Sequence, residues 1–346
     1  MSLTSILSDT KNHELRDKLR TEFLRPAFKL KSELKAPPLT KNYGIVGTAF
    51  DYLMRFYLQY NNKDKIIQRS GWVADHAYRS LTKYLSSKEQ LEIRTGFLHD
   101  RVFKIPHLIE LIESQYKEAK DNYDKFISDG QLTDKIISST IFLAKLDLYV
   151  RTKIVDSNFD NHDSADIKDI HSIISLVDKE LFIAKKNCYL NPVFGEGSMV
   201  VGGADADLII DNTLIDIKVT KHLKLEREYL NQVLGYYILS LIGGVNNNHL
   251  DKPIENIGIY FARHGELLTF PLSSFGDTQK FDTFKNWFVT YVTREQKLAD
   301  DLYNFVNKNF KKEVDKPKTK RKSTVKKKKV ADKIKSKSTK KKKSSP

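Results

Sequence analysis

Two aspartates and a lysine follow one another in a pattern that could support hydrolysis of a phosphodiester bond. Asp207 precedes an apolar run, and Asp216 and Lys218 alternate with apolar residues in the next run. Carboxylate oxygens are the ligands that Mg²⁺ prefers, and bound Mg²⁺ can lower the pKa of a water molecule and screen a phosphate. A nearby ammonium can orient the attacking water and stabilise the charge that develops on the phosphate oxygens.

The two apolar runs predict a β-hairpin that would bring these residues together. We expect Asn212-Thr213 to form its turn, because the flanking residues are typical of strands and an asparagine favours a tight connection. In that register Asp207 lies opposite Lys218, and Asp216 lies two residues earlier on the same strand. Paired strand residues point to one side of a sheet, so the two aspartates and the lysine are expected to share a face. A register slip of one residue would break this arrangement.

A structural role for the same residues stays open. A charged residue inside an apolar strand needs a partner or a function, so Asp207 and Lys218 could form an ion pair that merely joins the strands. Aspartates near turns also commonly bond to their own backbone, and Asp211 is expected to be one of these.

The run that contains these residues resembles the Asp…Asp-x-Lys core of the PD-(D/E)XK nuclease superfamily, with Asp207, Asp216 and Lys218 at the motif positions. The resemblance implies a metal-dependent DNA nuclease (a deoxyribonuclease, with exonuclease or endonuclease action left open) that uses Mg²⁺ or Mn²⁺. It implies that Asp207 and Asp216 bind the metal.

A second motif lies on the helix that is expected to follow the hairpin. Gln232 and Tyr236 are one helical turn apart and resemble the Gln-x-x-x-Tyr motif of the RecB-like branch, in which this face borders the active site and positions substrate or metal-bound water. This branch implies action on ends or single strands. By themselves the two residues are better explained as an ordinary helix flank, and they support the resemblance through their order after the Asp-x-Lys residues.

Further metal ligands are suggested by weaker similarities. Residues 47–53 resemble the Gly-x-x-x-His helix of RecB-like nucleases, with Asp51 in place of the histidine, although a surface acid on a core helix explains Asp51 equally well. The family often adds a glutamate from a segment before the hairpin, and Glu180 and Glu196 are both candidates.

The expected fold class is α/β (α+β), with a mixed β-sheet flanked by helices, a restriction-endonuclease-like core and a large helical N-terminal region. The expected domains are a mainly helical region 1–165, whose helix 47–60 would dock on the core, a nuclease core 166–310 and a disordered Lys-rich tail 311–346. Periodicity predicts helices near residues 15–23, 48–60, 106–127, 132–150, 167–188, 225–241 and 281–310 and a second hairpin of residues 256–263 and 266–272.

The positive charge is concentrated at one end of the chain. The net charge is +15, and residues 311–346 hold 18 Lys and Arg against three acids, so residues 1–310 are formally neutral. We expect the run Lys326, Lys327, Lys328 and Lys329 to tether DNA through salt-sensitive phosphate contacts; a dispensable solubilising tail is the alternative. Lys221 and Arg263 are the contacts with DNA expected from the folded part.

The remaining composition limits the function classes. Cys188 is the single cysteine, which excludes an internal disulfide and favours a reducing compartment, cytoplasmic or nucleoid-associated, or nuclear if the host is eukaryotic. No run is long and apolar enough for a membrane span, and no nucleotide-binding Gly-x-x-x-x-Gly-Lys-Ser/Thr motif is present, so a helicase or other motor would be a separate partner.

Two alternatives to a DNA nuclease stay open: a catalytically inactive nucleic-acid-binding protein with the same fold, and a nuclease acting on RNA.

Overall fold

The structure is a computed structural model of the 346-residue chain, and it describes residues 2–9, 13–28, 32–68, 71–99, 101–248, 250 and 253–314. Residues 1–295 form one compact unit, and residues 296–346 form a second unit that is described only as helix, through Val314. The run Lys326–Lys329 lies outside the described residues.

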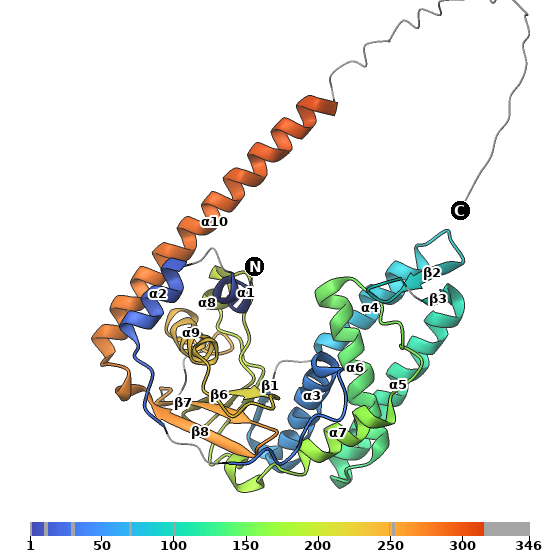
Figure 1. The fold of residues 1–346 in the computed structure, drawn as a ribbon, viewed down its shortest axis with the longest axis horizontal. Coiled ribbons are helices and arrows are strands. Elements are labelled where there is room, and N and C mark those ends of the chain that lie inside the picture. Colours follow the sequence, from blue (N-terminus) through green and yellow to red (C-terminus); the bar gives the residue numbers. More distant parts are fainter. Residues whose placement is uncertain are drawn as a thin grey trace, which may run out of the picture. The chain divides into compact units, whose positions relative to one another are not determined.

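A six-stranded mixed sheet forms the centre of the first unit (Figure 1). Its strand order is β1-β4-β5-β6-β7-β8; β1 pairs with β4 and β6 with β7 in parallel, and the other neighbours are antiparallel. The strands are β1 (Ile66–Gln68), β4 (Cys188–Leu190), β5 (Leu208–Ile210), β6 (Thr213–Lys218), β7 (Asn256–Phe261) and β8 (Glu266–Pro271), with β2 (Glu92–Thr95) and β3 (Arg101–Lys104) forming a separate hairpin. The expected α/β class with a mixed sheet flanked by helices is therefore confirmed.

Helices surround the sheet, and most of them match the periodicity of the sequence. Those at 15–23, 48–60, 106–127, 132–150, 225–241 and 281–310 are confirmed with shifts of a few residues at their ends. Among the described helices, none combines the length and the apolar character that a membrane crossing requires. The helices are α1 (Leu3–Ser8), α2 (His13–Glu22), α3 (Tyr43–Asn61), α4 (Val73–Ser86), α5 (Ile105–Asp129), α6 (Asp134–Thr152), α7 (Ser164–Ile174), α8 (Glu196–Val200), α9 (Arg227–Gly243) and α10 (Thr278–Val314), with short 3₁₀ turns η1 (Lys63–Lys65), η2 (Lys179–Phe182) and η3 (Leu272–Ser274).

The sheet separates two hydrophobic cores, because successive strand residues point to opposite sides. Leu208 and Ile215 pack with helices α3 to α7, whereas Ile209 and Leu214 pack with α1, α2, α9 and α10. The strand β1, which belongs to the expected helical region 1–165, pairs with β4. The helical region and the sheet are thus joined both by a strand and by a common core.

The expectation of one helix over residues 167–188 was wrong. Helix α7 ends at Ile174, and the chain continues through η2 into β4, which starts at Cys188. The side chain of Asn62, at the end of α3, donates to the carbonyl of Phe182 at 3.0 Å and accepts from the amide of Ala184 at 2.8 Å. These contacts, more than 100 residues apart in sequence, hold the segment extended.

Arg263 is placed in the core instead of on a surface that DNA could reach. Its guanidinium is 1% exposed and forms two bonds to the carboxylate of Asp169, at 2.6 and 3.0 Å, and one to the carbonyl of Ala36 at 3.1 Å. The expected phosphate contact of Arg263 is thus contradicted. The guanidinium of Arg263, in the turn after β7, instead bonds to Asp169 on α7 and to the backbone at Ala36.

We expect Asp169→Ala to lower the free energy of unfolding by about 3–5 kcal/mol, because it leaves a buried guanidinium without its carboxylate. Chemical denaturation measures this loss. The double substitution Arg263→Met with Asp169→Leu should recover most of it, since no buried charge remains. Lys18→Ala, which breaks a partly exposed i,i+4 pair with Glu22, should change stability by less than about 0.5 kcal/mol. A loss from Asp169→Ala no larger than that of Lys18→Ala would contradict a structural role for this pair.

Candidate functional site

The hairpin of β5 and β6 positions the two aspartates, although its turn differs from the expected one. Ile210 pairs with Thr213, so the turn is Asp211-Asn212. Asp211, the first of the two turn residues, has a positive φ of 52°, as the tight turns of two-residue hairpins require at that position. By extension of this register Asp207 lies opposite Asp216. The shift moves each pair by two positions, so the side-chain parity is unchanged.

A chain of polar contacts runs from the second strand to the helix behind it. The ammonium of Lys218 lies 2.7 Å from Oδ2 of Asp216 and donates to Oε1 of Gln232 at 2.8 Å. Nε2 of Gln232 in turn donates to the hydroxyl of Tyr236 at 2.9 Å. The ring of Tyr229 lies 5.0 Å from the Lys218 ammonium, within the range of a cation–π contact. The structure therefore brings the expected Asp-x-Lys and Gln-x-x-x-Tyr residues into one network.

The two aspartates are neighbours in a poorly solvated place. Burial, the charge of Asp216 and the charge of Asp51 raise the pKa of Asp207 well above its ordinary value. Burial also raises the pKa of Asp216, which is 1% exposed, although Lys218 opposes this effect. Burial alone would lower the pKa of Lys218, but Asp216 and Asp207 outweigh it and raise that pKa. Lys218 is thus held in its charged form by the carboxylates that it partly neutralises.

Asp51 reaches the same place from α3. Its charge contributes to the raised pKa of Asp205, Asp207 and Asp216. Its Oδ2 accepts from Arg55 at 2.8 Å, whereas Oδ1 is buried with no hydrogen-bond partner among the described residues. Asp51 is therefore a fourth carboxylate beside the hairpin, with an oxygen available to a ligand.

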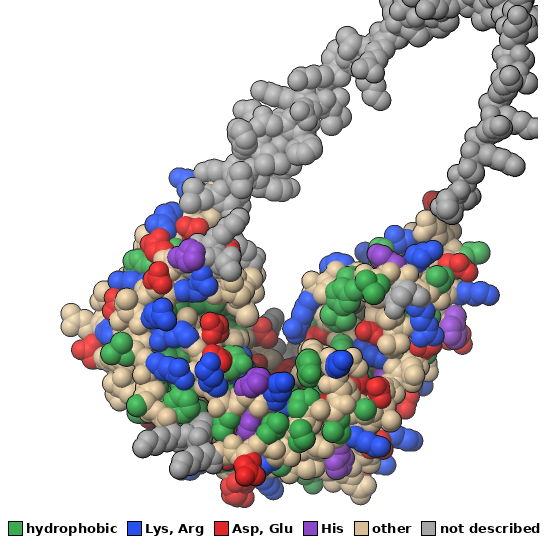
Figure 2. All heavy atoms as spheres, viewed as in Figure 1, with side chains coloured by type: hydrophobic (Ala, Val, Ile, Leu, Met, Phe, Trp, Pro, Cys, Tyr) green, Lys and Arg blue, Asp and Glu red, His purple; other side chains and the backbone are tan. Residues whose placement is uncertain are grey.

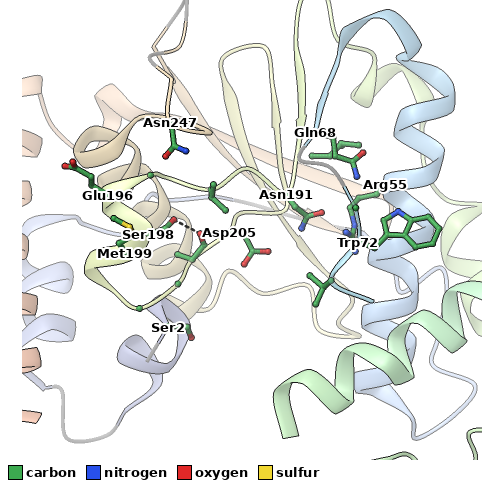
Figure 3. Close-up of a pocket in the computed structure, with 18 residues that line it drawn as sticks. Ser2, Arg55, Gln68, Trp72, Asn191, Glu196, Ser198, Met199, Asp205 and Asn247 are labelled. Atoms are coloured by element: carbon green, nitrogen blue, oxygen red, sulfur yellow. Dashed lines mark hydrogen bonds between the residues drawn. The ribbon is translucent and has the colours of Figure 1, made fainter. Parts of the chain in front are cut away.

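A pocket of about 1010 Å³ is lined by Asp205 (Figure 3), whereas Asp51, Asp207 and Asp216 are not among its lining residues. We call it the α3–α8 pocket. One wall comes from α8 and the loop that leads to Asp205, and the other comes from α3, the end of β1 and the start of α4. Figure 3 shows Asn191 and Asp205 lying between the walls, across from Arg55. The lining includes Arg55, Gln68, Trp72, Val73, Asn191, Glu196, Met199 and Asp205.

The other predicted site residues lie elsewhere. Glu180 is exposed on η2 and is not among the groups whose charge acts on Asp207 or Asp216. Glu196 lines the α3–α8 pocket, but it is exposed and Figure 3 shows its carboxylate directed away from Asp205. Lys221 is exposed in the loop after β6. Of the two glutamate candidates, neither is brought against the aspartates.

Two further residues of this region were not identified from the sequence. Arg55 is four residues after Asp51, a spacing typical of an ion pair on a helix, and this spacing could have indicated it. Asn191 precedes Pro192, and in sequence such a pair indicates only the end of a helix. It has a positive φ of 45°, and its Oδ1 is buried without a partner among the described residues. That strained placement depends on β4 and could not be recognised from sequence.

The donor set suits a hard divalent cation, but it is not assembled around one. Across the described part of the chain, no three His, Cys, Asp or Glu side chains already stand close enough together to hold a metal ion. Asp51, Asp207 and Asp216 repel one another electrostatically, and Asp216 faces the ammonium of Lys218. Besides this ion pair, Oδ2 of Asp216 has no well-oriented hydrogen bond. Carboxylate oxygens with unused acceptor capacity are the ligands that Mg²⁺ or Mn²⁺ takes.

We expect Asp207→Asn to stabilise the protein at pH 8 by an amount on the order of 1 kcal/mol, as substitutions of strained site residues often do. Because the pKa of Asp207 is raised in the folded state, the folded protein loses stability as the pH rises from the ordinary value of 3.8 through the raised pKa. An asparagine does not ionise and can still accept the 2.6 Å bond from the amide of Ile217.

The gain should therefore shrink toward pH 4. Urea denaturation at both pH values measures it, with Asp282→Asn on α10 as a control because the Asp282 side chain is 51% exposed. An Asp207→Asn protein less stable than wild type at pH 8 would show that the aspartate is not under electrostatic strain.

Comparisons of the chain with protein-family models, with curated proteins and with solved structures found no match. The functional interpretation of this site therefore depends on the chemistry of its own residues: four interacting carboxylates, one ammonium and a pocket that one of the carboxylates, Asp205, lines.

Proposed function

We propose that the chain is a metal-dependent nuclease that hydrolyses phosphodiester bonds in DNA, with Asp207, Asp216 and Lys218 at its catalytic centre. One observation carries the proposal: Asp207 and Asp216 lie opposite each other, burial raises the pKa of both, and one half-buried ammonium, that of Lys218, faces them. Such an arrangement is unfavourable for folding, and strongly perturbed carboxylates in a cleft are typical of functional sites. A simple structural ion pair would need one carboxylate, not several.

The metal ligands in this proposal are Asp207 and Asp216, with Asp51 as a third. A bound Mg²⁺ or Mn²⁺ would supply Lewis acidity and lower the pKa of a water molecule. In the chain itself, Asp207 would keep the orientation set by the amide of Ile217 at 2.6 Å. Asp51 would turn its unpartnered Oδ1 toward the same centre.

Lys218 is proposed to act as a cation. Since Asp216 and Asp207 raise its pKa, the ammonium keeps its proton at neutral pH and cannot serve as a general base. It would instead hold a non-bridging phosphate oxygen and the attacking water in line with the leaving group. Gln232 and Tyr236 act through Lys218 as positioning residues, because Gln232 fixes the ammonium and Tyr236 fixes Gln232.

The finer fold assignment belongs to the same proposal. The β5–β6 hairpin, the parallel neighbour β7 and helix α9 on the site-bearing face would form a restriction-endonuclease-like core. Helix α3 would complete the site from the other side of the sheet. The helices α4 to α7 would serve to hold α3 in place, since they pack with it in one core.

The charge distribution favours a nucleic-acid substrate delivered by the tail. Residues 1–310 are formally neutral, and Figure 2 shows acidic and basic side chains interspersed over the visible face. Residues 311–346, together with exposed Lys221, would supply the attraction to a polyanion.

We expect purified protein to cleave DNA in Mg²⁺ or Mn²⁺ and to lose this activity in EDTA. Asp216→Asn and Lys218→Met should each lower kcat at least about 100-fold, because each removes a group that acts on the scissile phosphate. A fluorescent DNA assay with linear, circular and single-stranded substrates, and with RNA of the same sequence, measures this. Asp282→Asn on α10, which removes a 51% exposed carboxylate paired with Lys285, is the matched control.

Cleavage that persists in Asp216→Asn would mean that another protein or another site is responsible. Preference for RNA would contradict the assignment of DNA. If wild-type protein binds DNA but cleaves no nucleic acid with either metal, the nuclease proposal fails and the binding-only alternative takes its place.

Removal of residues 315–346 should weaken DNA binding and flatten its dependence on salt, with kcat at saturating substrate unchanged. Each lost phosphate contact lowers the slope of log K against log salt by about 0.7 to 0.9. Fluorescence anisotropy between 50 and 200 mM salt, a range over which such contacts respond strongly, measures the slope. An unchanged slope would rule out the tail as a tether.

A further inference from the structure

The α3–α8 pocket offers a cationic group that the proposed chemistry does not use. The Arg55 side chain lines this pocket, and its Nη2 and Nε bond to the carboxylate and carbonyl of Asp51, at 2.8 and 3.2 Å. Its Nη1 donates to no residue that the structure describes. The guanidinium also lies 4.2 Å from the centroid of the Tyr52 ring. Arg55 is thus fixed on two sides while part of its donor fork is left for a ligand in the pocket.

The same pocket exposes apolar side chains on both walls. Met199, on α8, is 71% exposed, and Val73, at the start of α4, is 47% exposed. Apolar side chains on both walls of one pocket offer contacts to the apolar faces of a ligand, because ligand pockets are lined largely by apolar groups with a few polar ones that fix orientation. An occupant that suits this pocket therefore combines apolar faces with negative charge.

We infer that the α3–α8 pocket binds unpaired nucleotides of the substrate strand, with Arg55 contacting a phosphate next to the scissile one and Met199 and Val73 contacting the bases. This inference rests on the proposed function and names the form of DNA that reaches its site. The position of Arg55 follows from Asp51, which holds the guanidinium and lies beside the catalytic aspartates at the same time.

Unpaired nucleotides fit better than a double helix for two physical reasons. A base shows its apolar face only when it is unstacked, and protein contacts with such faces are typical of single-strand binding. The duplex is also stiff and carries its phosphates on its outside. Asp216 is 1% exposed, and the Lys218 side chain is 18% exposed, so a phosphate has to enter a recess to meet them. A flexible single strand can do so.

The pocket is not a general polyanion site, because Asp205 and Glu196 also line it. Acidic residues repel a phosphate backbone unless a cation compensates for them. Affinity there should consequently depend strongly on the single guanidinium of Arg55.

The test measures binding of a fluorescent single-stranded DNA oligonucleotide and of a blunt duplex with the same sequence. Asp216→Asn is present in every protein, so that cleavage does not interfere, and Mg²⁺ is present throughout. Arg55→Gln should raise Kd for the single strand about tenfold, as expected for loss of a bond to a charged group, and should lower the salt slope by about 0.7.

Met199→Glu tests the pocket independently, because an exposed side chain can be changed with little risk to folding. A negative charge there should raise Kd for the single strand about fivefold. The matched control is Leu98→Glu, the same kind of change at a residue 86% exposed in the β2–β3 connection, outside the α3–α8 pocket. It should leave Kd unchanged, and thermal unfolding checks that each variant is folded.

Equal effects of Met199→Glu and Leu98→Glu, or equal losses for duplex and single strand, would overturn the inference. The outcome is separable from that of the proposed function. A wild-type protein that cleaves DNA while the pocket variants bind normally refutes only the inference. A wild-type protein that cleaves nothing refutes the nuclease, and the binding measurements still decide what the pocket holds.

Discussion

The repulsion between Asp207 and Asp216 is the constraint on which the rest of the site depends. Two adjacent, poorly solvated carboxylates repel each other when both are ionised, and the positive charge of Lys218 offsets this repulsion only in part. The β5–β6 register forces them together, since strand pairing leaves the side chains no choice of face. The repulsion between Asp207 and Asp216 therefore destabilises one place within an otherwise well-packed sheet.

Two helices, α9 and α3, bring further polar residues to the two aspartates. Helix α9 supplies Gln232 and Tyr236, which orient the ammonium from the core that covers one face of the sheet. Helix α3 belongs to the other core and brings Asp51 and Arg55 to the same place. The site therefore lies where the two cores meet. In the proposed function, α4 to α7 would hold α3 in place, since these helices pack with α3 in one core.

The face of the sheet on which Asp207, Asp216 and Lys218 lie could be predicted from the sequence, for a physical reason. The turn was placed one residue too late, yet the resulting register shift of two positions preserves the side-chain parity. Strand alternation is therefore a robust signal even where the turn is not. The Gln232–Tyr236 spacing was equally informative, because a helix brings residues four apart to the same face.

Features that depend on distant partners could not be predicted. Arg263 was expected to contact DNA, but it is buried and bonded to Asp169, which is 94 residues away in the sequence. The segment before β4 looked helical because the contacts of Asn62 that keep it extended are not visible in its own sequence. Asn191 and the α3–α8 pocket arise only when α3, α8 and β4 come together.

Calorimetric titration of the metal-free protein with Mn²⁺ is the most direct test of the central claim that these opposed carboxylates exist to receive a divalent cation. The account predicts saturable binding that is accompanied by proton release at mildly acidic pH, since carboxylates with raised pKa must give up protons to bind metal. Binding should be lost in Asp207→Asn and retained in Asp282→Asn. Absence of saturable Mn²⁺ binding, or equal binding by both variants, would contradict the account.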